Sequence, residues 1–373
     1  TSPNFVAGAS GAILTTGSIE TALNAGTSVT IATNGGGAEA GTITINDDIA
    51  KTAGGDATLT FNADSEITRN IGFSDATLNI TSTVGLLDLV FNAPTNFTAG
   101  TGNTLTLNLD ANGGVISFAS TLLLSNVDAT IDGATTVVSL TAGTTSGPHP
   151  LIFNDNLTAT NITTNGASLT LNGALNTTDN LTLTGTLDGT GKLTVSSLFN
   201  ANSSFLGGSG TFETPVGSIT TIPNNIQIED SRVWNNEGTI NWTASVGNPR
   251  FYIYQTAVFN NLANGIFNDS TSSAALAAIS GHNTAQFNNI GTYNKTGTSR
   301  NIIQGPTFVN TGTVNVSAGD FEIYPSGTPP ASDTGDYIAT GTGTLDFRGP
   351  RTFSATTTIS SSTSVTLVSG SGN

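Results

Sequence analysis

Residues 287–293 read Phe-Asn-Asn-Ile-Gly-Thr-Tyr, and residues 308–314 read Phe-Val-Asn-Thr-Gly-Thr-Val. The same pattern occurs earlier as Trp-Asn-Asn-Glu-Gly-Thr-Ile at 234–240 and as Phe-Asn-Asn at 259–261. The aromatic residues that open these copies lie 25, 28 and 21 residues apart. Propeller blades repeat about every 40–45 residues, so these shorter and uneven intervals favour a solenoid, whose corners tolerate insertions.

Short runs in which apolar and polar residues alternate recur along the chain. Residues 58–62 read Thr-Leu-Thr-Phe-Asn and residues 104–109 read Thr-Leu-Thr-Leu-Asn-Leu, and similar runs occupy 42–46, 77–81 and 168–173. A period of two predicts strands with one apolar face.

Two further patterns concern the expected strands and helices. Leucine recurs every six residues from Leu169 through Leu175 to Leu193, a spacing that suits one strand plus a corner. Helical signals are rare: residues 18–26 predict a short helix with Ser18 as N-cap and Gly26 as the stop, and residues 274–279 fit either a helical turn or a strand.

We therefore predict an all-β chain that forms a right-handed parallel β-helix of about 16 coils, each of about 20–25 residues, in a rod some 75–80 Å long. Inward Leu, Ile, Val and Phe would form the core, with Phe259, Phe287 and Phe308 in one stack. Asn at corners would bond to Asn one coil away. Outward Thr would cover the faces, because like charges stacked at strand spacing repel one another.

The composition agrees with this prediction and excludes several classes of function. Only 9% of the residues are charged, where soluble proteins average about 25%. The chain has 66 Thr, 40 Asn and 44 Gly, but no Cys and no Met. A formal charge of −16 makes nucleic acid an unexpected partner, and the lack of Cys excludes disulfides and thiolate chemistry. No apolar stretch is long enough to span a membrane.

The chain shows two textures rather than separate domains. Thr-Leu runs dominate residues 1–206 and aromatic-Asn-Asn and Gly-Thr copies dominate 207–373, which we interpret as two halves of one solenoid. Residues 148–150 (Pro-His-Pro) predict a corner or extruded loop, and residues 325–336 predict a longer loop. Neither end shows an obvious polar cap, so either the cap is unrecognised or the chain is a segment of a longer fibre. The start, Thr-Ser-Pro without a signal peptide, predicts cleavage from a longer precursor.

Residues 17–31 (Gly-Ser-Ile-Glu-Thr-Ala-Leu-Asn-Ala-Gly-Thr-Ser-Val-Thr-Ile), together with the runs at 41–46, 55–60 and 76–80, carry a family resemblance. They resemble the repetitive stalk of filamentous-haemagglutinin-like exoproteins of the two-partner secretion pathway. The Asn-Asn-x-Gly-Thr copies are similar to those of large bacterial surface proteins and autotransporter passengers. The resemblance implies a right-handed parallel β-helix, export to the cell surface, and a role in adhesion, biofilm or cell contact.

Charged and aromatic residues gather in one place, around residues 229–254. Glu229-Asp230-Ser231-Arg232 is the densest charged cluster, and Arg250, Tyr252 and Tyr254 follow about one coil later. On one face of a solenoid, Asp230, Arg232, Arg250, Tyr252 and Tyr254 would form a glycan-contact or catalytic patch. The alternative is a surface ion pair beside stacked aromatic rings.

Other polar residues give weaker signals. Asp47, Asp48, Asp64 and Glu66 are a possible cation site, but the repeat lacks the Gly-Gly-x-Gly-x-Asp form of calcium-binding coils, so we expect no metal. His149 and His282 have no second His or evident carboxylate in local register and are interpreted as loop residues. No phosphate-loop, dinucleotide or Gly-x-Ser-x-Gly motif occurs, and we expect no cofactor. Asn-x-Ser/Thr triplets are frequent, and we interpret their Asn residues as mainly structural.

The sequence thus predicts an extracellular, non-catalytic stalk or adhesive fibre segment. Its expected partners are cell-surface glycans or proteins and further copies of the same fibre. A carbohydrate-active β-helix enzyme, either a polysaccharide lyase or a hydrolase, and a phage-tail fibre are the alternatives. An enzyme would need a groove in which at least three ionisable groups converge across coils.

Overall fold

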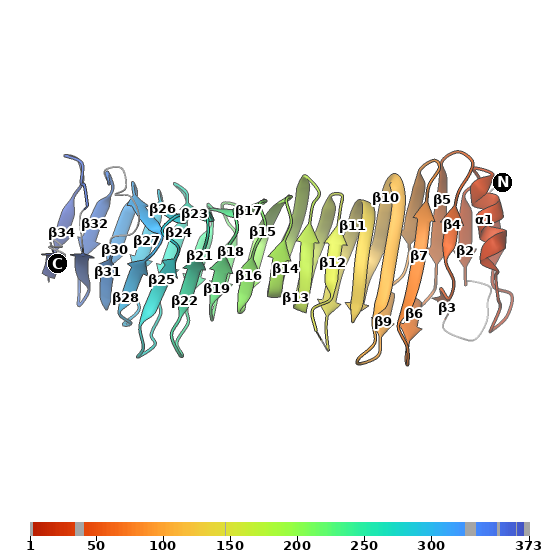
Figure 1. Cartoon of the computed structure of the whole chain (residues 1–373), viewed down its shortest axis with the longest axis horizontal. Helices are drawn as coiled ribbons and strands as arrows, with labels where there is room; N and C mark the ends of the chain where they lie inside the picture. The colour runs from red at the N-terminus through yellow and green to blue at the C-terminus, as the bar shows by residue number, and fades with distance from the viewer. Residues whose placement is uncertain are drawn as a thin grey trace. The chain divides into compact units, whose positions relative to one another are not determined.

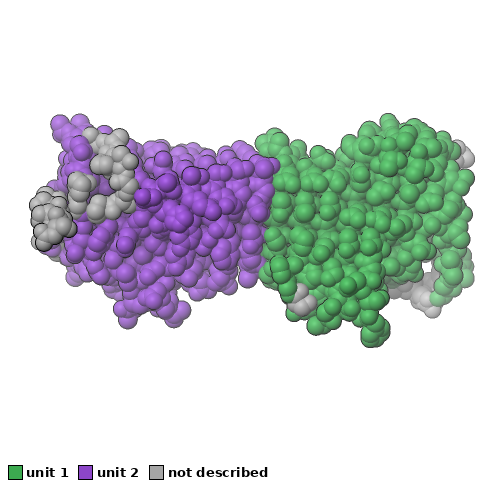
Figure 2. All heavy atoms as spheres, in the orientation of Figure 1, with its two compact units in different colours: residues 1–178 green, residues 179–373 purple. Residues whose placement is uncertain are grey.

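The computed structural model describes residues 3–33, 41–145, 147–324, 333–348, 351–362 and 364–368. It is all-β apart from one helix in the described part, and its parallel strands stack as a β-solenoid of about 16 turns (Figure 1). The predicted parallel β-helix is therefore confirmed. The chain divides into two compact units, residues 1–178 and 179–373 (Figure 2). The change of texture at Gly207 falls inside the second unit.

The first unit holds α1 and the strands β1 to β13. Their bounds are β1 (Asn4–Val6), α1 (Thr16–Asn24), β2 (Val29–Ala32), β3 (Thr42–Thr44), β4 (Ile49–Lys51), β5 (Ala57–Asn62), β6 (Glu66–Ile71), β7 (Ala76–Ser82), β8 (Leu87–Phe91), β9 (Thr95–Ala99), β10 (Leu105–Ser125), β11 (Val127–Gly143), β12 (Pro150–Phe153) and β13 (Leu157–Leu171). The division between the units falls within β14 (Leu175–Asp188).

The second unit holds the remaining strands. They are β15 (Lys192–Ala201), β16 (Ser204–Leu206), β17 (Thr211–Thr214), β18 (Ile219–Ile222), β19 (Ile226–Ile228), β20 (Val233–Asn236), β21 (Thr239–Trp242), β22 (Arg250–Ile253), β23 (Val258–Asn261), β24 (Ile266–Asp269), β25 (Ala277–Gly281), β26 (Gln286–Asn289), β27 (Thr292–Lys295), β28 (Asn301–Gln304), β29 (Thr307–Asn310), β30 (Thr313–Val316), β31 (Asp320–Ile323), β32 (Asp336–Ala339), β33 (Thr344–Arg348), β34 (Ile359–Ser361) and β35 (Ser364–Val368).

Strands pair in parallel with the corresponding strand of the next coil. The step between partners varies from 18 residues, where Leu151 lies opposite Leu169, to 31 residues, where Ile49 lies opposite Ile80. Coils are therefore more variable than the expected 20–25 residues. Because corners leave the sheet while strands stay in register, insertions there do not disturb the pairing.

The aromatic column of the second unit follows the repeat that predicted it. Phe259 pairs with Phe287, and Phe287 pairs with Phe308. The ring centroids of these two pairs are 4.8 and 5.3 Å apart, in edge-to-face geometry. Such rings combine full burial with a favourable quadrupole arrangement. The predicted Phe stack is confirmed.

The predicted Asn ladders are present, but they lie along strands rather than at corners. An inward ladder joins Asn236, Asn261, Asn289 and Asn310, with amide distances of 2.9, 2.8 and 2.8 Å. Outward ladders join two further sets, Asn235-Asn260-Asn288 and Asn241-Asn268-Asn294-Asn315. An amide has both a donor and an acceptor, so a row of Asn can continue from coil to coil without an unpaired group. The Asn of the triplets at Asn241, Asn294 and Asn315 therefore serves the structure.

The Gly of the Gly-Thr copies marks a tight corner. A Cβ on Gly291 would collide with the carbonyl oxygen of Gly265, and one on Gly312 would collide with that of Gly291. Backbones of successive coils approach too closely there for any side chain. The repeat therefore keeps Gly at this position for steric reasons.

Two local predictions are corrected, and one open alternative is decided. The helix α1 begins at Thr16 with Thr15 as N-cap, not at Ser18, although Gly26 follows it with φ of 70° as expected. Residues 277–281 form β25 rather than a helical turn. Leu175 is 61% exposed, because the inward position is taken by Asn176, whose amide bonds the main chain of Leu157 and Gly173.

The helix α1 also supplies a cap that the sequence did not reveal. It packs Ile19 and Leu23 inward and lies along the edge of β4 that faces away from β7 (Figure 1). Glu20 Oε1 accepts the Ala50 N–H at 2.9 Å, and Asn24 Oδ1 accepts the N–H groups of Thr52 and Ala53 at 2.7 and 3.0 Å. These side chains satisfy donors that an open strand edge would leave free.

Candidate functional site

The predicted patch lies on the outer face of one sheet of the second unit, which we call the tyrosine face. It is formed by β16, β19, β22, β25, β28, β31 and β33, which pair in that order. Inward Ile and Phe fill alternate positions, for example Phe251 and Ile253 of β22. The residues between and after them, Arg250, Tyr252 and Tyr254, therefore point outward and are half-buried.

The two tyrosines form a stacked platform on this face. Their ring centroids are 5.2 Å apart with an interplanar angle of 18°, and Tyr254 lies 5.1 Å from the ring of His282 on the next coil. Partial burial, the neighbouring Tyr252 and Glu229 raise the pKa of Tyr254, against an opposing effect of Arg250. The Tyr254 hydroxyl is therefore a neutral hydrogen-bonding group at physiological pH.

Close backbone contact holds His282 in place. A Cβ on Gly281 would collide with the carbonyl oxygen of Ile253, so only Gly fits where β25 ends. The His282 Nδ1 then accepts the backbone N–H of Gln255 at 3.0 Å. His282 is thus a loop residue, as expected, that follows β25 and is held on the tyrosine face by its Nδ1 bond.

Arg250 is anchored beside the tyrosines. Its Nη1 donates to the carbonyl oxygens of Leu276, at 2.8 Å, and Pro249, at 3.2 Å. Its backbone N–H donates to Asn225 Oδ1 at 2.9 Å. The guanidinium therefore bridges two coils with its orientation fixed.

Arg232 does not belong to this face. It is 1% exposed, and it donates from Nε to the Gly207 oxygen at 2.6 Å and from Nη2 to the Gly189 oxygen at 3.2 Å. Burial lowers its pKa to about 10, although the charges of Asp188 and Asp230 act in the opposite direction. The prediction that Arg232 joins an exposed patch is wrong, because strand alternation places it on the inward side with Trp234.

Asp230 is exposed but serves a corner. Its φ is 61°, in the left-handed region, and its Oδ2 accepts the Gly208 N–H at 2.9 Å. Asp and Asn tolerate such angles better than other side chains. The structure therefore brings together Arg250, Tyr252 and Tyr254, while Asp230 and Arg232 act within the main-chain framework.

The sequence did not single out an ion-pair cluster further along the same face. Glu322 is 4% exposed and is bound by Arg300, while Arg348 contacts Glu322 at 3.1 Å and Asp346 at 2.7 Å. The Arg348 guanidinium also lies 5.4 Å from the ring of Tyr324. Burial of Glu322 acts to raise its pKa, but the hydrogen bond and charge of Arg300 and the charge of Arg348 outweigh burial, and the net pKa is lowered. Arg300, Glu322 and Arg348 are far apart in sequence, so only the coil register could have joined them.

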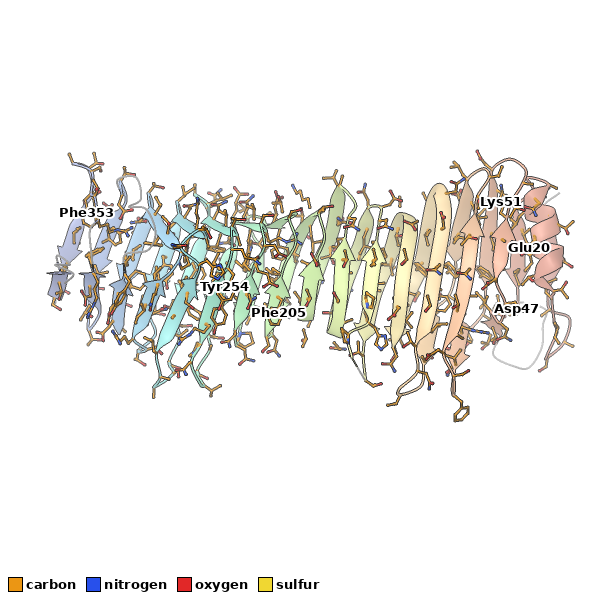
Figure 3. The ribbon with its side chains drawn as sticks, viewed as in Figure 1. Glu20, Asp47, Lys51, Phe205, Tyr254 and Phe353 are labelled. Atoms are coloured by element: carbon orange, nitrogen blue, oxygen red, sulfur yellow. The ribbon has the colours of Figure 1, made fainter. Side chains whose placement is uncertain are left out.

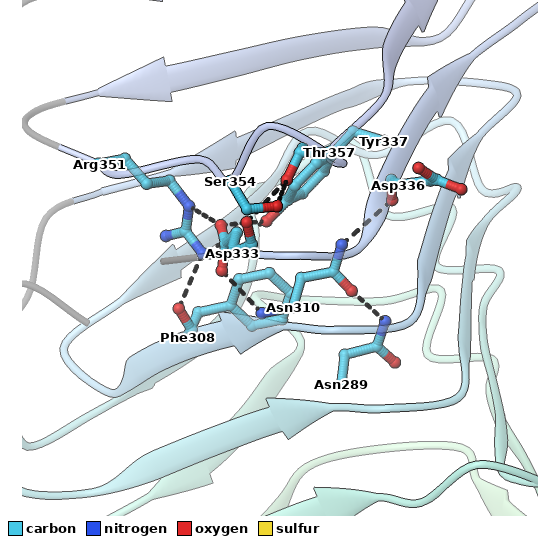
Figure 4. Close-up of polar contacts among 9 residues, drawn as sticks. All are labelled: Asn289, Phe308, Asn310, Asp333, Asp336, Tyr337, Arg351, Ser354 and Thr357. Atoms are coloured by element: carbon cyan, nitrogen blue, oxygen red, sulfur yellow. Dashed lines mark hydrogen bonds and ion pairs between the residues drawn. The ribbon is translucent and has the colours of Figure 1, made fainter. Parts of the chain in front are cut away.

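A second buried carboxylate lies where a coil closes (Figure 4). Asp333 is fully buried and accepts the Tyr337 hydroxyl at 2.8 Å, the Asn310 backbone N–H at 2.9 Å, and the Arg351 Nε. Arg351 also donates to the Phe308 oxygen at 2.8 Å. This cluster is closed and internally satisfied, so its role is to tie coils together. Of the predicted loop at 325–336, residues 325–332 lie outside the described residues.

The remaining polar candidates are dispersed. Asp48 accepts Asn79 Nδ2 at 2.7 Å and Glu66 accepts Asn96 Nδ2 at 2.8 Å, so these carboxylates serve neighbouring coils. In the described ranges no three His, Cys, Asp or Glu side chains form a group that could hold a metal ion.

His149 is buried and its Nδ1 bonds Asp128 Oδ1 at 2.8 Å. The local sequence did not show this partner, because Asp128 comes from the preceding coil.

Comparison with known proteins found no matching family model, no similar curated protein and no similar solved structure. The nine-residue α1, the one helix in the described part of the chain, is too short to cross a bilayer.

Proposed function

We propose that this chain is a structural and adhesive segment of a large secreted bacterial surface protein, and that its tyrosine face contacts glycans. The observation that carries the proposal is the contrast between that face and the rest of the described surface. Of the five Tyr in the chain, Tyr293 and Tyr337 are buried, whereas Tyr252, Tyr254 and Tyr324 all lie on the tyrosine face. Elsewhere on the described surface outward positions carry mainly Thr, Asn and Ser, with single exposed apolar residues such as Phe73.

The amphipathic character of Tyr supports glycan contact. A Tyr ring offers a flat apolar surface, and its hydroxyl offers a hydrogen bond, so it recognises ligands with both kinds of surface. Sugars have apolar ring faces and hydroxyl-bearing edges. Arg250 and His282 add polar groups at the rim of the platform.

The cluster around Glu322 is the observation that favours the alternative, a carbohydrate-active enzyme, because four ionisable groups converge across coils. Its chemistry does not suit general acid catalysis, which needs a carboxyl group with a raised pKa. The net pKa of Glu322 is lowered, and both Arg300 and Arg348 bind its carboxylate. An ion pair of this kind fixes structure rather than transferring protons.

Incubation of the purified chain with a panel of neutral and acidic polysaccharides tests both functions. We expect co-sedimentation with at least one insoluble glycan, and no release of reducing ends or unsaturated products. Glu322→Gln is the matched variant: cleavage by the wild type that this variant loses would establish the enzyme instead. Failure to bind any glycan would contradict the adhesive role of the tyrosine face.

A further inference from the structure

Six residues from six successive coils form a single row on the tyrosine face. We call this the glycan row; it consists of Phe205, Gln227, Tyr252, Ser280, Gln304 and Tyr324. Each is the direct register partner of the next. Tyr324 continues the row because Ile303 pairs with Ile323, and the Tyr324 N–H donates to the Ile303 oxygen at 3.0 Å.

The row contains three rings with hydrogen-bonding groups between them. Phe205 is one of the three aromatic residues of the row and is 43% exposed, although exposure of a Phe side chain to water is unfavourable. Figure 3 shows Phe205 and Tyr254 in the same region of the second unit. Gln227, Ser280 and Gln304 lie between the rings and carry amide or hydroxyl groups. Precisely placed polar groups among apolar surfaces are typical of ligand sites.

The arginine side chains beside the row already donate to acceptors within the protein. Arg250 donates to main-chain carbonyl oxygens, and Arg300 and Arg348 bind Glu322. The chain as a whole carries a formal charge of −16. The described arginine side chains of this face are thus engaged within the protein, and the overall negative charge repels an acidic polysaccharide. The surface suits an uncharged ligand.

The spacing of the row identifies the shape of that ligand. Successive parallel strands are about 4.8 Å apart, which is close to the rise of one sugar in an extended β-1,4-linked chain. Phe205 and Tyr252 are two coils apart, so they would meet the same face of sugars i and i+2 in a flat chain with two sugars per turn. Tyr324 lies three coils further along and would meet the other face of sugar i+5. Resting on the proposed glycan contact, we infer that the ligand is a neutral, extended β-1,4-linked glycan that lies along the stack with one sugar per coil.

Titration calorimetry with cello-oligosaccharides of two to six sugars tests this inference on the full chain. We expect affinity to rise with length up to six sugars. Maltohexaose, which has the same sugars in a curved α-1,4-linked chain, should bind at least about tenfold more weakly. Tyr252→Ala should lower the affinity for cellohexaose about tenfold, because truncating a central aromatic anchor typically costs this much.

Ile266→Ala is the matched control, because Ile266 is 37% exposed on β24, outside the glycan row. It should bind cellohexaose as the wild type does. Phe205→Ala provides a second test if Tyr252→Ala changes the melting temperature. Equal affinity for maltohexaose or for an acidic polysaccharide would overturn the extended neutral ligand but leave glycan binding intact. No binding to any glycan would instead overturn the proposed function itself.

Discussion

The two units use the same coil but fill it differently. In the first unit the inward columns are mostly aliphatic, as where Leu59 pairs with Leu89 and Leu78 with Leu107. In the second unit edge-to-face rings continue from coil to coil through Trp234, Phe259, Phe287 and Phe308. Both solutions bury a dry column, so the hydrophobic effect alone does not distinguish them.

The second difference between the two units concerns their buried polar side chains. Buried polar side chains of the first unit are scattered and bond largely to main chain, as Lys51 does to the Ala53 oxygen and Thr135 to the Gly133 oxygen. The second unit instead has the continuous inward row that runs from Asn236 to Asn310.

Such a row specifies register. A slip of one residue turns every side chain to the wrong face, whereas a slip of two keeps apolar residues inside and costs a purely aliphatic core little. An inward Asn would lose its partner after either slip and be buried unpaired. The comparison indicates that the second unit uses polar rows for specificity and rings for stability.

The largest expected effect comes from breaking the aromatic column at its centre. Phe287 lies within 6.5 Å, between ring centroids, of five other rings. Phe287→Ala should lower the free energy of unfolding of the second unit by about 3–5 kcal/mol. The fluorescence of Trp234 and Trp242, both buried in that unit, would measure this as a lower urea midpoint.

Phe91→Ala is the matched change in the first unit, where Phe91 stacks between Phe61 and Phe118 at 5.2 and 4.6 Å. It should unfold its own unit earlier and leave the Trp transition nearly unchanged. If both variants shift the Trp transition equally, the two units unfold as one cooperative structure.

Most of the fold could be predicted from the sequence because its signals are periodic. Alternation predicted strands such as β5, and the aromatic-Asn-Asn copies predicted the Phe stack from Phe259 to Phe308. Only part of the tyrosine face could be predicted from the sequence. Tyr252 and Tyr254 are close together in the sequence and could be grouped, whereas residues of other coils could not. Arg232 was misplaced because the alternation that turns it inward with Trp234 was not extended to the residue before the strand. Glu322 was missed because its partners lie one coil away on each side.

The buried hydroxyl of Tyr293 gives a pH-dependent test. It donates to Asp269 Oδ2 at 2.9 Å, and burial, followed by the charge and hydrogen bond of Asp269, raises its pKa well above 10.0. The folded chain therefore keeps this proton when the unfolded chain releases it, so the stabilisation is complete below pH 10 and declines above it.

Tyr293→Phe should cost about 1.5–3 kcal/mol at pH 7, since it removes a hydrogen bond to a buried carboxylate. The difference between wild type and variant should narrow by up to about 1.4 kcal/mol per pH unit above pH 10. Urea titrations at pH 7, 10 and 11 would measure it. A difference that stays constant over this range would show that Tyr293 ionises in the folded chain as readily as in the unfolded one.

The smallest expected effect compares the inward and outward faces of one strand, β23. Asn260 and Asn261 are adjacent on β23, and each bonds an Asn on the coil before and the coil after at 2.8–2.9 Å. Asn261 is fully buried, whereas Asn260 is half-buried and points outward. Both make the same amide pairs, but Asn261 Nδ2 also donates to the Thr292 oxygen at 3.0 Å, so a difference between their Ala variants reports burial together with that bond.

Asn261→Ala should cost about 1–2 kcal/mol because its neighbours lose a partner where water cannot replace it. Asn260→Ala should cost no more than about 0.5 kcal/mol, since water can satisfy the outward amides. The same Trp-monitored urea titration would compare them. Equal costs would mean that the inward Asn row contributes no more to stability than an outward Asn ladder does. A larger cost at Asn261 would mean that the second unit maintains its register through amide pairs that only the correct alignment of coils can complete.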